Sequence, residues 1–194
     1  MTQLGAFAAA MAVCDPSLEG HASRVGDHAE VLARRLGWSD DALTDLRLGA
    51  AFHDVGKVSI RPGVLTKAGR LTPQELAAIR VHPVEGAWLI SGIRSLAPAM
   101  PYVLFHHERW EGGGYPTGRT GAEIPIEGRV LAITDAFDAM TSLRPYRERL
   151  SGDEAALEVE RCGGSQFDPQ LAELFVDAYA AGEIAVDENV AVAV

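Results

Sequence analysis

The chain has 194 residues, of which 47% are hydrophobic and 23% are charged, and this composition is typical of one globular domain rather than a disordered chain. The net charge of −10 argues against non-specific binding to DNA or to anionic membranes. No apolar run reaches the roughly 18 residues that a membrane-spanning helix needs. The two cysteines, Cys14 and Cys162, form no CxxC pair, so we expect a reducing, cytoplasmic location.

The N-terminal region contains the most apolar stretch of the chain. We expect it to form a packed first helix over about residues 3–14, within a single domain that spans residues 1–194. A signal peptide would need a basic start, and the first basic residue is Arg24. A lipoprotein anchor at Cys14 is the alternative interpretation of this stretch.

Helical periodicity continues after this region, and no segment alternates with the period of two that is typical of strands. Val25, Ala29 and Leu32 form an apolar stripe, which predicts a helix that ends near Gly37. Ser39 is a good N-cap for a second helix. The two segments therefore predict a helical pair.

The rest of the chain continues this pattern between two glycine-containing loops, predicted over residues 56–71 and 109–124. Thr72-Pro73-Gln74-Glu75 predicts a helix start with a capping Thr, Pro at the first position and Glu at the third. The fold is thus predicted to be all-α, a compact bundle of about seven to eight helices. The remaining helices are expected over residues 82–92, 97–108, 126–142, 153–162 and 168–180, before a tail from about residue 182.

Histidine and aspartate recur at predicted helix ends and on apolar faces. His53-Asp54 ends the second helix, where burial is unfavourable unless both side chains are hydrogen-bonded or bind a metal. For this dipeptide alone, a buried His–Asp hydrogen bond is the simpler interpretation. Asp135 and Asp138 lie in an otherwise apolar segment, so we expect one to face a site and the other to anchor a neighbouring element. His28 is assigned to the rim of its helix.

Seven of these residues form a set that is too large for one tetrahedral zinc site. The set contains no thiolate, and its imidazole and carboxylate donors suit two first-row metals bridged by an aspartate and a solvent oxygen. Such a pair could hold a hydroxide for in-line attack on phosphorus. The predicted ligands are His21, His53, Asp54, His82, His106, His107 and Asp135.

Three basic residues are candidates for binding phosphate. Lys57 follows Asp54 by three positions, and the intervening Gly56 would let the backbone turn so that the ammonium returns over the metals. Arg144 and Arg147 flank a Pro-Tyr pair shortly after Asp135, and guanidinium groups suit phosphate oxygens. Solvated surface cations are the alternative.

Two sequence motifs of the chain resemble those of a known family. His53-Asp54-Val55-Gly56-Lys57 resembles the HD motif with its lysine, and residues 106–116, HHERWEGGGYP, resemble the extended GYP motif. The similarity continues through Asp135 and Asp138 to Gln166-Phe167-Asp168-Pro169. The chain is therefore similar to HD-GYP domains, bacterial phosphodiesterases of cyclic dinucleotides and chiefly of cyclic di-GMP.

The resemblance implies a metal centre, commonly of iron or manganese, built from the seven ligands. It also implies that Lys57, Arg144 and Arg147 bind the scissile phosphate and that Tyr115 lines the substrate cleft. We assign Asp54 as the bridge between two metals. Ser17 occupies the position of a glutamate that helps some members bind a third metal, so two metals are expected here.

The expected function is hydrolysis of cyclic di-GMP to linear pGpG, and onward to GMP as a further option. One alternative keeps the chemistry but changes the substrate to cyclic GMP-AMP or another nucleotide. The other is a catalytically silent domain that binds a nucleotide or a partner protein. Members of the family are usually output domains behind a receiver or sensor, so an upstream domain of this kind is expected as an option, as are a partner protein and an oligomer.

Overall fold

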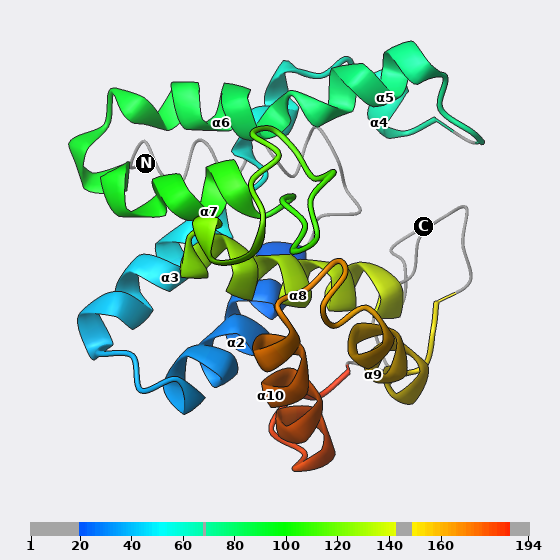
Figure 1. Ribbon diagram of the computed structural model, residues 1–194. Helices are drawn as coiled ribbons and strands as arrows, with labels where there is room; N and C mark the ends of the chain where they lie inside the picture. The colour runs from blue at the N-terminus through cyan, green and yellow to red at the C-terminus, as the bar shows by residue number, and fades with distance from the viewer. Residues whose placement is uncertain (1–19, 68, 143–148, 187–194) are drawn as a thin grey trace.

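The computed structural model describes residues 20–67, 69–142 and 149–186, and these residues form an all-α bundle without a β-strand (Figure 1). This result confirms the predicted fold class. Short 3-10 helices η2 (Val55–Ser59), η3 (Arg94–Ala99) and η4 (Gly121–Glu123) connect some of the α-helices. The α-helices are α2 (His21–Arg35), α3 (Asp40–Phe52), α4 (Pro62–Leu65), α5 (Pro73–Arg80), α6 (His82–Ser91), α7 (Met100–Phe105), α8 (Ile126–Thr141), α9 (Gly152–Arg161) and α10 (Pro169–Ala180).

Two apolar clusters hold these helices together around α8, which crosses the middle of the molecule in Figure 1. The main cluster joins α2, α3, α8, α9 and α10, and each helix contributes a fully buried side chain, such as Leu32, Leu46, Phe137, Val159 and Phe175. The smaller cluster joins the end of α3 and η2 to α6, η3 and α7. As a result, several helix ends are fixed beside the middle of α8.

Most predicted elements are present within a few residues of their expected bounds. The Ser39 hydroxyl accepts a hydrogen bond from the amide of Ala42 at the start of α3. Thr72 and Glu75 form the reciprocal capping box expected at the start of α5. The expected first helix over residues 3–14 lies outside the described residues.

Two expectations about local structure were wrong. The segment 56–71 is not only loop, because it contains part of η2 and the single turn α4, which has Pro62 near its start. The α-helix expected over 97–108 is shorter, since η3 runs to Ala99 with Pro98 inside it and α7 then ends at Phe105. Proline lacks an amide hydrogen, which disfavours a continuous α-helix through this stretch.

Gly56 is needed for close packing rather than for a sharp turn. Its φ is not in the left-handed region, but a Cβ there would lie 1.9 Å from the carbonyl oxygen of His82. The glycine therefore lets η2 approach the start of α6, which brings the HD motif close to His82. No helix in the described part of the chain is long and apolar enough to cross a membrane.

Candidate metal centre and adjoining cleft

The seven predicted metal ligands come from distant parts of the sequence and meet where helix ends surround α8. Most of them are buried, with exposed fractions of 0 to 4% for His21, His53, Asp54, His82 and His106. Their positions follow from helix boundaries rather than from one contiguous motif. His21 begins α2, His53 and Asp54 follow α3, His82 begins α6, His106 and His107 follow α7, and Asp135 lies within α8.

Asp54 lies at the centre of this cluster, and its two carboxylate oxygens face two different pairs of histidines, which define the two sides of the cluster. Its Oδ1 is 3.2 Å from Nε2 of His82 and 3.9 Å from Nε2 of His106. Its Oδ2 is 3.4 Å from Nε2 of His53 and 3.9 Å from Nε2 of His21. This arrangement has the geometry of a carboxylate that could bridge two ions.

The remaining two ligand candidates divide between the two sides. His107 offers a ring nitrogen to the set that contains Asp54 and His82, whose ligand atoms lie within 4.8 Å of one another. Asp135 lies on the other side, with Oδ1 3.3 Å from Nε2 of His21 and 3.9 Å from Nε2 of His53. Each side therefore offers histidine and carboxylate donors.

The hydrogen bonds of the imidazole rings direct free nitrogens into the cluster. His53, His82 and His106 each donate Nδ1–H to the carbonyl oxygen three residues earlier, at 2.8, 2.9 and 3.0 Å. In the neutral tautomer with this hydrogen bond, Nε2 carries a lone pair that faces the cluster, and the Nε2 atoms of His82 and His106 lie only 3.2 Å apart. Two lone pairs at this distance repel each other unless a proton or a metal ion lies between them, so the donor set fits divalent metals.

Burial and neighbouring charges favour the protonation states that metal binding requires at His106, His107 and Asp54, whereas His21 must lose its Nε2 proton when it binds a metal. Burial lowers the pKa of His106 well below its usual value and lowers that of His107 to about 4. Burial alone would also lower the pKa of His21, but hydrogen bonds with Asp135 and Asp138 outweigh it and raise that pKa to about 9. Burial opposes ionisation of Asp54, yet Lys57 and His53 hold its pKa well below the usual range.

Asp138 lies on the far side of His21 from the cluster. Its Oδ2 accepts a 2.7 Å hydrogen bond from Nδ1 of His21, and its Oδ1 accepts a 2.5 Å bond from Nε of Arg24. It can therefore orient His21 without contacting an ion itself. His28 is buried but outside the cluster, with Nε2 3.1 Å from the carbonyl oxygen of Ala185.

The predicted phosphate-binding residues have different positions. Nζ of Lys57 donates to Oδ2 of Asp54 at 2.5 Å, which puts the ammonium at the edge of the cluster. The other two, Arg144 and Arg147, lie outside the described residues. Ser17, the position used to argue against a third metal, is also outside them.

Tyr115 forms one wall of the site. Its ring stacks on His107 with centroids 4.8 Å apart and an interplanar angle of 30°, and its amide donates to the carbonyl oxygen of His107 at 3.1 Å. The guanidinium carbon of Arg80 lies 5.5 Å from the Tyr115 ring centroid. Burial raises the pKa of Tyr115, so the phenol stays protonated and can donate a hydrogen bond.

The loop that carries Tyr115 is held by Glu108. Oε1 of Glu108 accepts hydrogen bonds from the amide and hydroxyl of Thr117 at 2.6 and 2.7 Å and from the amide of Gly118 at 3.1 Å. Glu111 instead points outward and pairs with Arg109 at 3.0 Å. The internal order of the loop therefore depends on Glu108 rather than on Glu111.

A cleft of about 290 Å³ opens beside the cluster, and it is lined by His107, Tyr115 and Asp135 among others. The HD domain family matches residues 7–171 of the chain. The chain belongs to the HD domain family. This membership confirms the resemblance that the HD and GYP motifs indicated.

Relatives of this HD domain carry related names. The chain is 37% identical over 166 residues to a "Cyclic di-GMP phosphodiesterase" of Thermotoga maritima, covering 84% of this chain and 45% of the relative. It is 35% identical over 159 residues to a "3'3'-cGAMP-specific phosphodiesterase 2" of Vibrio cholerae, covering 81% of this chain and 30% of the relative. The chain thus spans less than half the length of these curated relatives.

A solved structure shows the same fold. The HD domain of the phosphodiesterase PgpH of Listeria monocytogenes, in complex with cyclic di-AMP, superposes with a TM-score of 0.65 at 20% identity. The superposition covers 91% of this chain and 94% of that one. At this identity the likeness concerns the fold alone.

The cleft of this HD domain also has lining residues to which the sequence analysis gave no role: Arg80, Arg109 and Gln166. Arg109 donates to Gln166 at 3.1 Å, and both residues lie within motifs quoted for the resemblance. Their place in those motifs was the available signal. The sequence signal for Arg80 was weaker, because it consists only of a position two residues before the predicted ligand His82.

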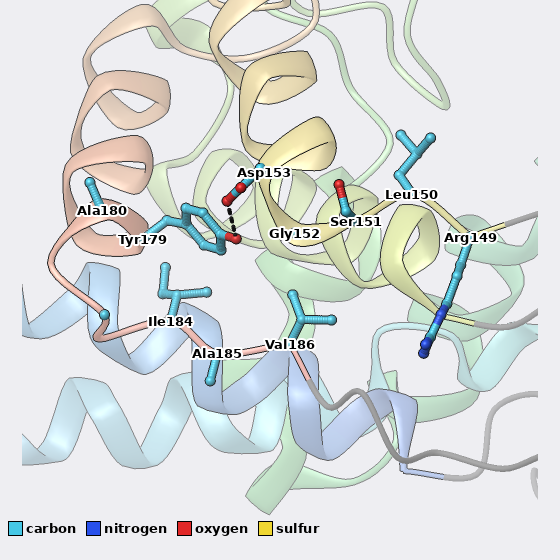
Figure 2. Close-up of a pocket in the computed structure, with 11 residues that line it drawn as sticks. Arg149, Leu150, Ser151, Gly152, Asp153, Tyr179, Ala180, Ile184, Ala185 and Val186 are labelled. Atoms are coloured by element: carbon cyan, nitrogen blue, oxygen red, sulfur yellow. Dashed lines mark hydrogen bonds between the residues drawn. The ribbon is translucent and has the colours of Figure 1, made fainter.

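A second cavity, of about 610 Å³, lies beside α9 and the end of α10 (Figure 2). Its lining includes the hydroxyl of Tyr179, which donates to Asp153 at 2.8 Å, and aliphatic side chains such as Ile184 and Val186. None of the seven predicted ligands lines it. The cleft beside the histidine cluster is therefore the candidate functional site.

Proposed function

We propose that this HD domain is a metal-dependent phosphodiesterase that hydrolyses cyclic di-GMP to linear pGpG. The observation that carries the proposal is the division of six other donors into two sets that share Asp54. A shared carboxylate between two histidine-rich sets supports a centre of two ions, for which we propose iron or manganese. The names of the relatives support a cyclic dinucleotide as substrate.

When bound, the ions would supply a nucleophile derived from water and stabilise negative charge on the phosphoryl oxygens. The chain's own residues hold and shield this chemistry. Asp54 would bridge the two positions, and the backbone carbonyls that accept from His53, His82 and His106 fix the orientation of those rings. Burial of the cluster limits competing access of bulk water.

Lys57 is proposed to bind the scissile phosphate. Its ammonium lies beside Asp54, within reach of an oxygen on a substrate bound at the cluster. As negative charge develops on the phosphoryl group, a preorganised cation stabilises the transition state more than the ground state. Arg144 and Arg147 are proposed for the same phosphate on the strength of the family resemblance, and Tyr115 for the wall of the cleft.

A second candidate substrate is cyclic GMP-AMP, which the Vibrio cholerae relative at 35% identity favours. It contains the same phosphodiester chemistry and differs in one base. The third alternative, a silent binding domain, is disfavoured because all seven ligand candidates are present and meet.

The greater length of the relatives supports a regulatory sensor or receiver domain, and the cysteine content supports a cytoplasmic location.

The test is turnover by protein purified without oxygen and assayed for metal content. Cyclic di-GMP and cyclic GMP-AMP are incubated in parallel, and the products are separated by chromatography. We expect the wild type to release pGpG from cyclic di-GMP faster than it releases linear product from cyclic GMP-AMP. We expect an Asp54→Ala variant to release no linear product from either substrate. A metal-loaded protein that releases no linear product from either substrate would contradict the proposal.

A further inference from the structure

Arg80 is an exposed cation that lines the cleft together with Tyr115 and His107. It is the last residue of α5, and one residue separates it from His82 at the start of α6. Its guanidinium carbon lies 5.5 Å from the centroid of the Tyr115 ring. That ring in turn stacks on His107. Arg80 is thus one aromatic ring away from the metal centre.

The charge of Arg80 is uncompensated within the described part of the chain. No acidic side chain described there forms an ion pair with it, although the protein carries a net charge of −10. The other arginine of the cleft differs, because Arg109 pairs with Glu111 at 3.0 Å and donates to Gln166 at 3.1 Å. Arg80 is therefore the cleft arginine whose donors are available to a ligand.

The contact with Tyr115 also limits the freedom of the Arg80 side chain. A guanidinium held over an aromatic ring keeps its edge donors free for hydrogen bonds while its face is occupied. Less side-chain entropy is lost when such a group binds an anion than when a fully mobile arginine does. The position is suited to a phosphate that lies away from the metals.

A cyclic dinucleotide has two phosphodiester groups, each with one negative charge, and only one of them is cleaved at a time. The metal ions proposed for the centre and the ammonium of Lys57 would compensate the negative charge of the cleaved group. The other group enters the same acidic protein and needs its own cation, because an unpaired anion in a cleft is unfavourable. Arginine forms strong charge-assisted hydrogen bonds with phosphate oxygens.

We propose that Arg80 binds the second, uncleaved phosphate of the cyclic dinucleotide. The inference rests on the proposed function and goes beyond it by assigning a residue to the non-reacting half of the substrate. Because that phosphate carries the same charge throughout the reaction, Arg80 stabilises ground state and transition state equally. Its loss should therefore raise KM and leave kcat unchanged.

The test compares Arg80→Ala with Arg119→Ala in the metal-loaded protein. Arg119 is a matched control, since its guanidinium carbon lies 4.7 Å from the Phe105 ring centroid but it does not line the cleft. Three measurements are made on each: KM and kcat for cyclic di-GMP, the rate with bis(p-nitrophenyl) phosphate, which has a single phosphodiester, and calorimetric binding of non-hydrolysable phosphorothioate analogues of cyclic di-GMP and cyclic GMP-AMP.

We expect Arg80→Ala to raise KM for cyclic di-GMP by about tenfold or more, the usual effect of losing a charge-assisted hydrogen bond. Both analogues should bind more weakly by a similar factor, while kcat and the rate with the single diester stay within twofold of the wild type, as do all values for Arg119→Ala. If Arg80→Ala binds both analogues more weakly but the wild type hydrolyses no cyclic di-GMP, the result would support the role of Arg80 in binding and refute only the proposed reaction.

Four results would overturn the inference. Unchanged binding of both analogues by Arg80→Ala would show that Arg80 is a solvated cation. An equal loss of rate with the single diester would show that Arg80 acts by supporting Tyr115 and His107. A loss confined to cyclic di-GMP would assign Arg80 to a guanine base instead. A wild type that binds neither analogue would refute both this inference and the proposed substrate.

Discussion

Replacing Asp138 with asparagine should weaken metal binding on the His21 side of the cluster without removing a ligand. Asp138 is 1% exposed and receives the 2.7 Å hydrogen bond from Nδ1 of His21. Burial opposes its ionisation, but hydrogen bonds from His21 and Arg24 lower its pKa to about 2, so it is a carboxylate at neutral pH. A carboxylate in this position orients the imidazole and makes Nε2 a better electron-pair donor to a metal ion.

The expected magnitude follows from this role. Changing such an outer partner of a metal ligand typically weakens metal affinity by about 10–100-fold, which corresponds to about 1.4–2.7 kcal/mol. Asparagine also loses the ion pair with Arg24, whose Nε lies 2.5 Å from Oδ1. We therefore expect a loss of folding free energy of about 2 kcal/mol besides the metal effect.

The assay is a titration of metal-free protein with Mn²⁺ in competition with a chelator, together with urea unfolding. Asp168→Asn is the matched control, because Asp168 is 5% exposed and pairs with Arg129 at 2.6 Å but contacts none of the seven ligands. Both variants should lose stability, and only Asp138→Asn should lose metal affinity. Wild-type affinity in Asp138→Asn, or an equal loss in Asp168→Asn, would refute the role given to Asp138.

Three other predictions address catalysis, packing and pH. Lys57→Ala should keep its metal but lose on the order of 10²–10³ in kcat, measured with cyclic di-GMP; an unchanged kcat would place Lys57 outside the reaction. Leu32→Ala should lower the free energy of unfolding by about 2–5 kcal/mol in urea, because Leu32 is fully buried in the main cluster; a change below 1 kcal/mol would contradict that packing. The hydrogen bond from Lys67 lowers the pKa of Glu75 from 4.5 to about 2, so its stabilising effect is present above pH 4.5 and is lost as the pH falls towards 2. The difference in Tm between wild type and Glu75→Gln should shrink over that range, and a constant difference would count against the ion pair.

The helical fold was predictable because local signals and packing agree. The stripe of Val25, Ala29 and Leu32 is fully buried in α2, and the caps at Ser39 and Thr72 begin α3 and α5. The errors occur where proline or short turns interrupt the pattern, as in η3 and α4. Such turns have too few residues for a helical period to be visible in sequence.

The meeting of the seven ligand candidates was predictable, because buried histidines and aspartates are unfavourable without a partner. Sequence reasoning could not show that Asp54 presents its two oxygens to different histidines, because this depends on how α3, α6 and α7 end beside α8. The place of Arg80 over Tyr115 was also not predictable, since the two residues lie on separate elements. Such long-range contacts come from tertiary packing and leave no local pattern.

The most direct test of a centre bridged by Asp54 is stepwise reconstitution of the metal-free protein. Mn²⁺ or Fe²⁺ is added without oxygen, and the metal bound per chain is measured together with the rate of cyclic di-GMP hydrolysis. The account predicts that the rate rises until two ions are bound per chain, and that Asp54→Ala binds neither ion tightly and stays inactive. Full activity with one ion per chain, or two tightly bound ions in Asp54→Ala, would contradict it.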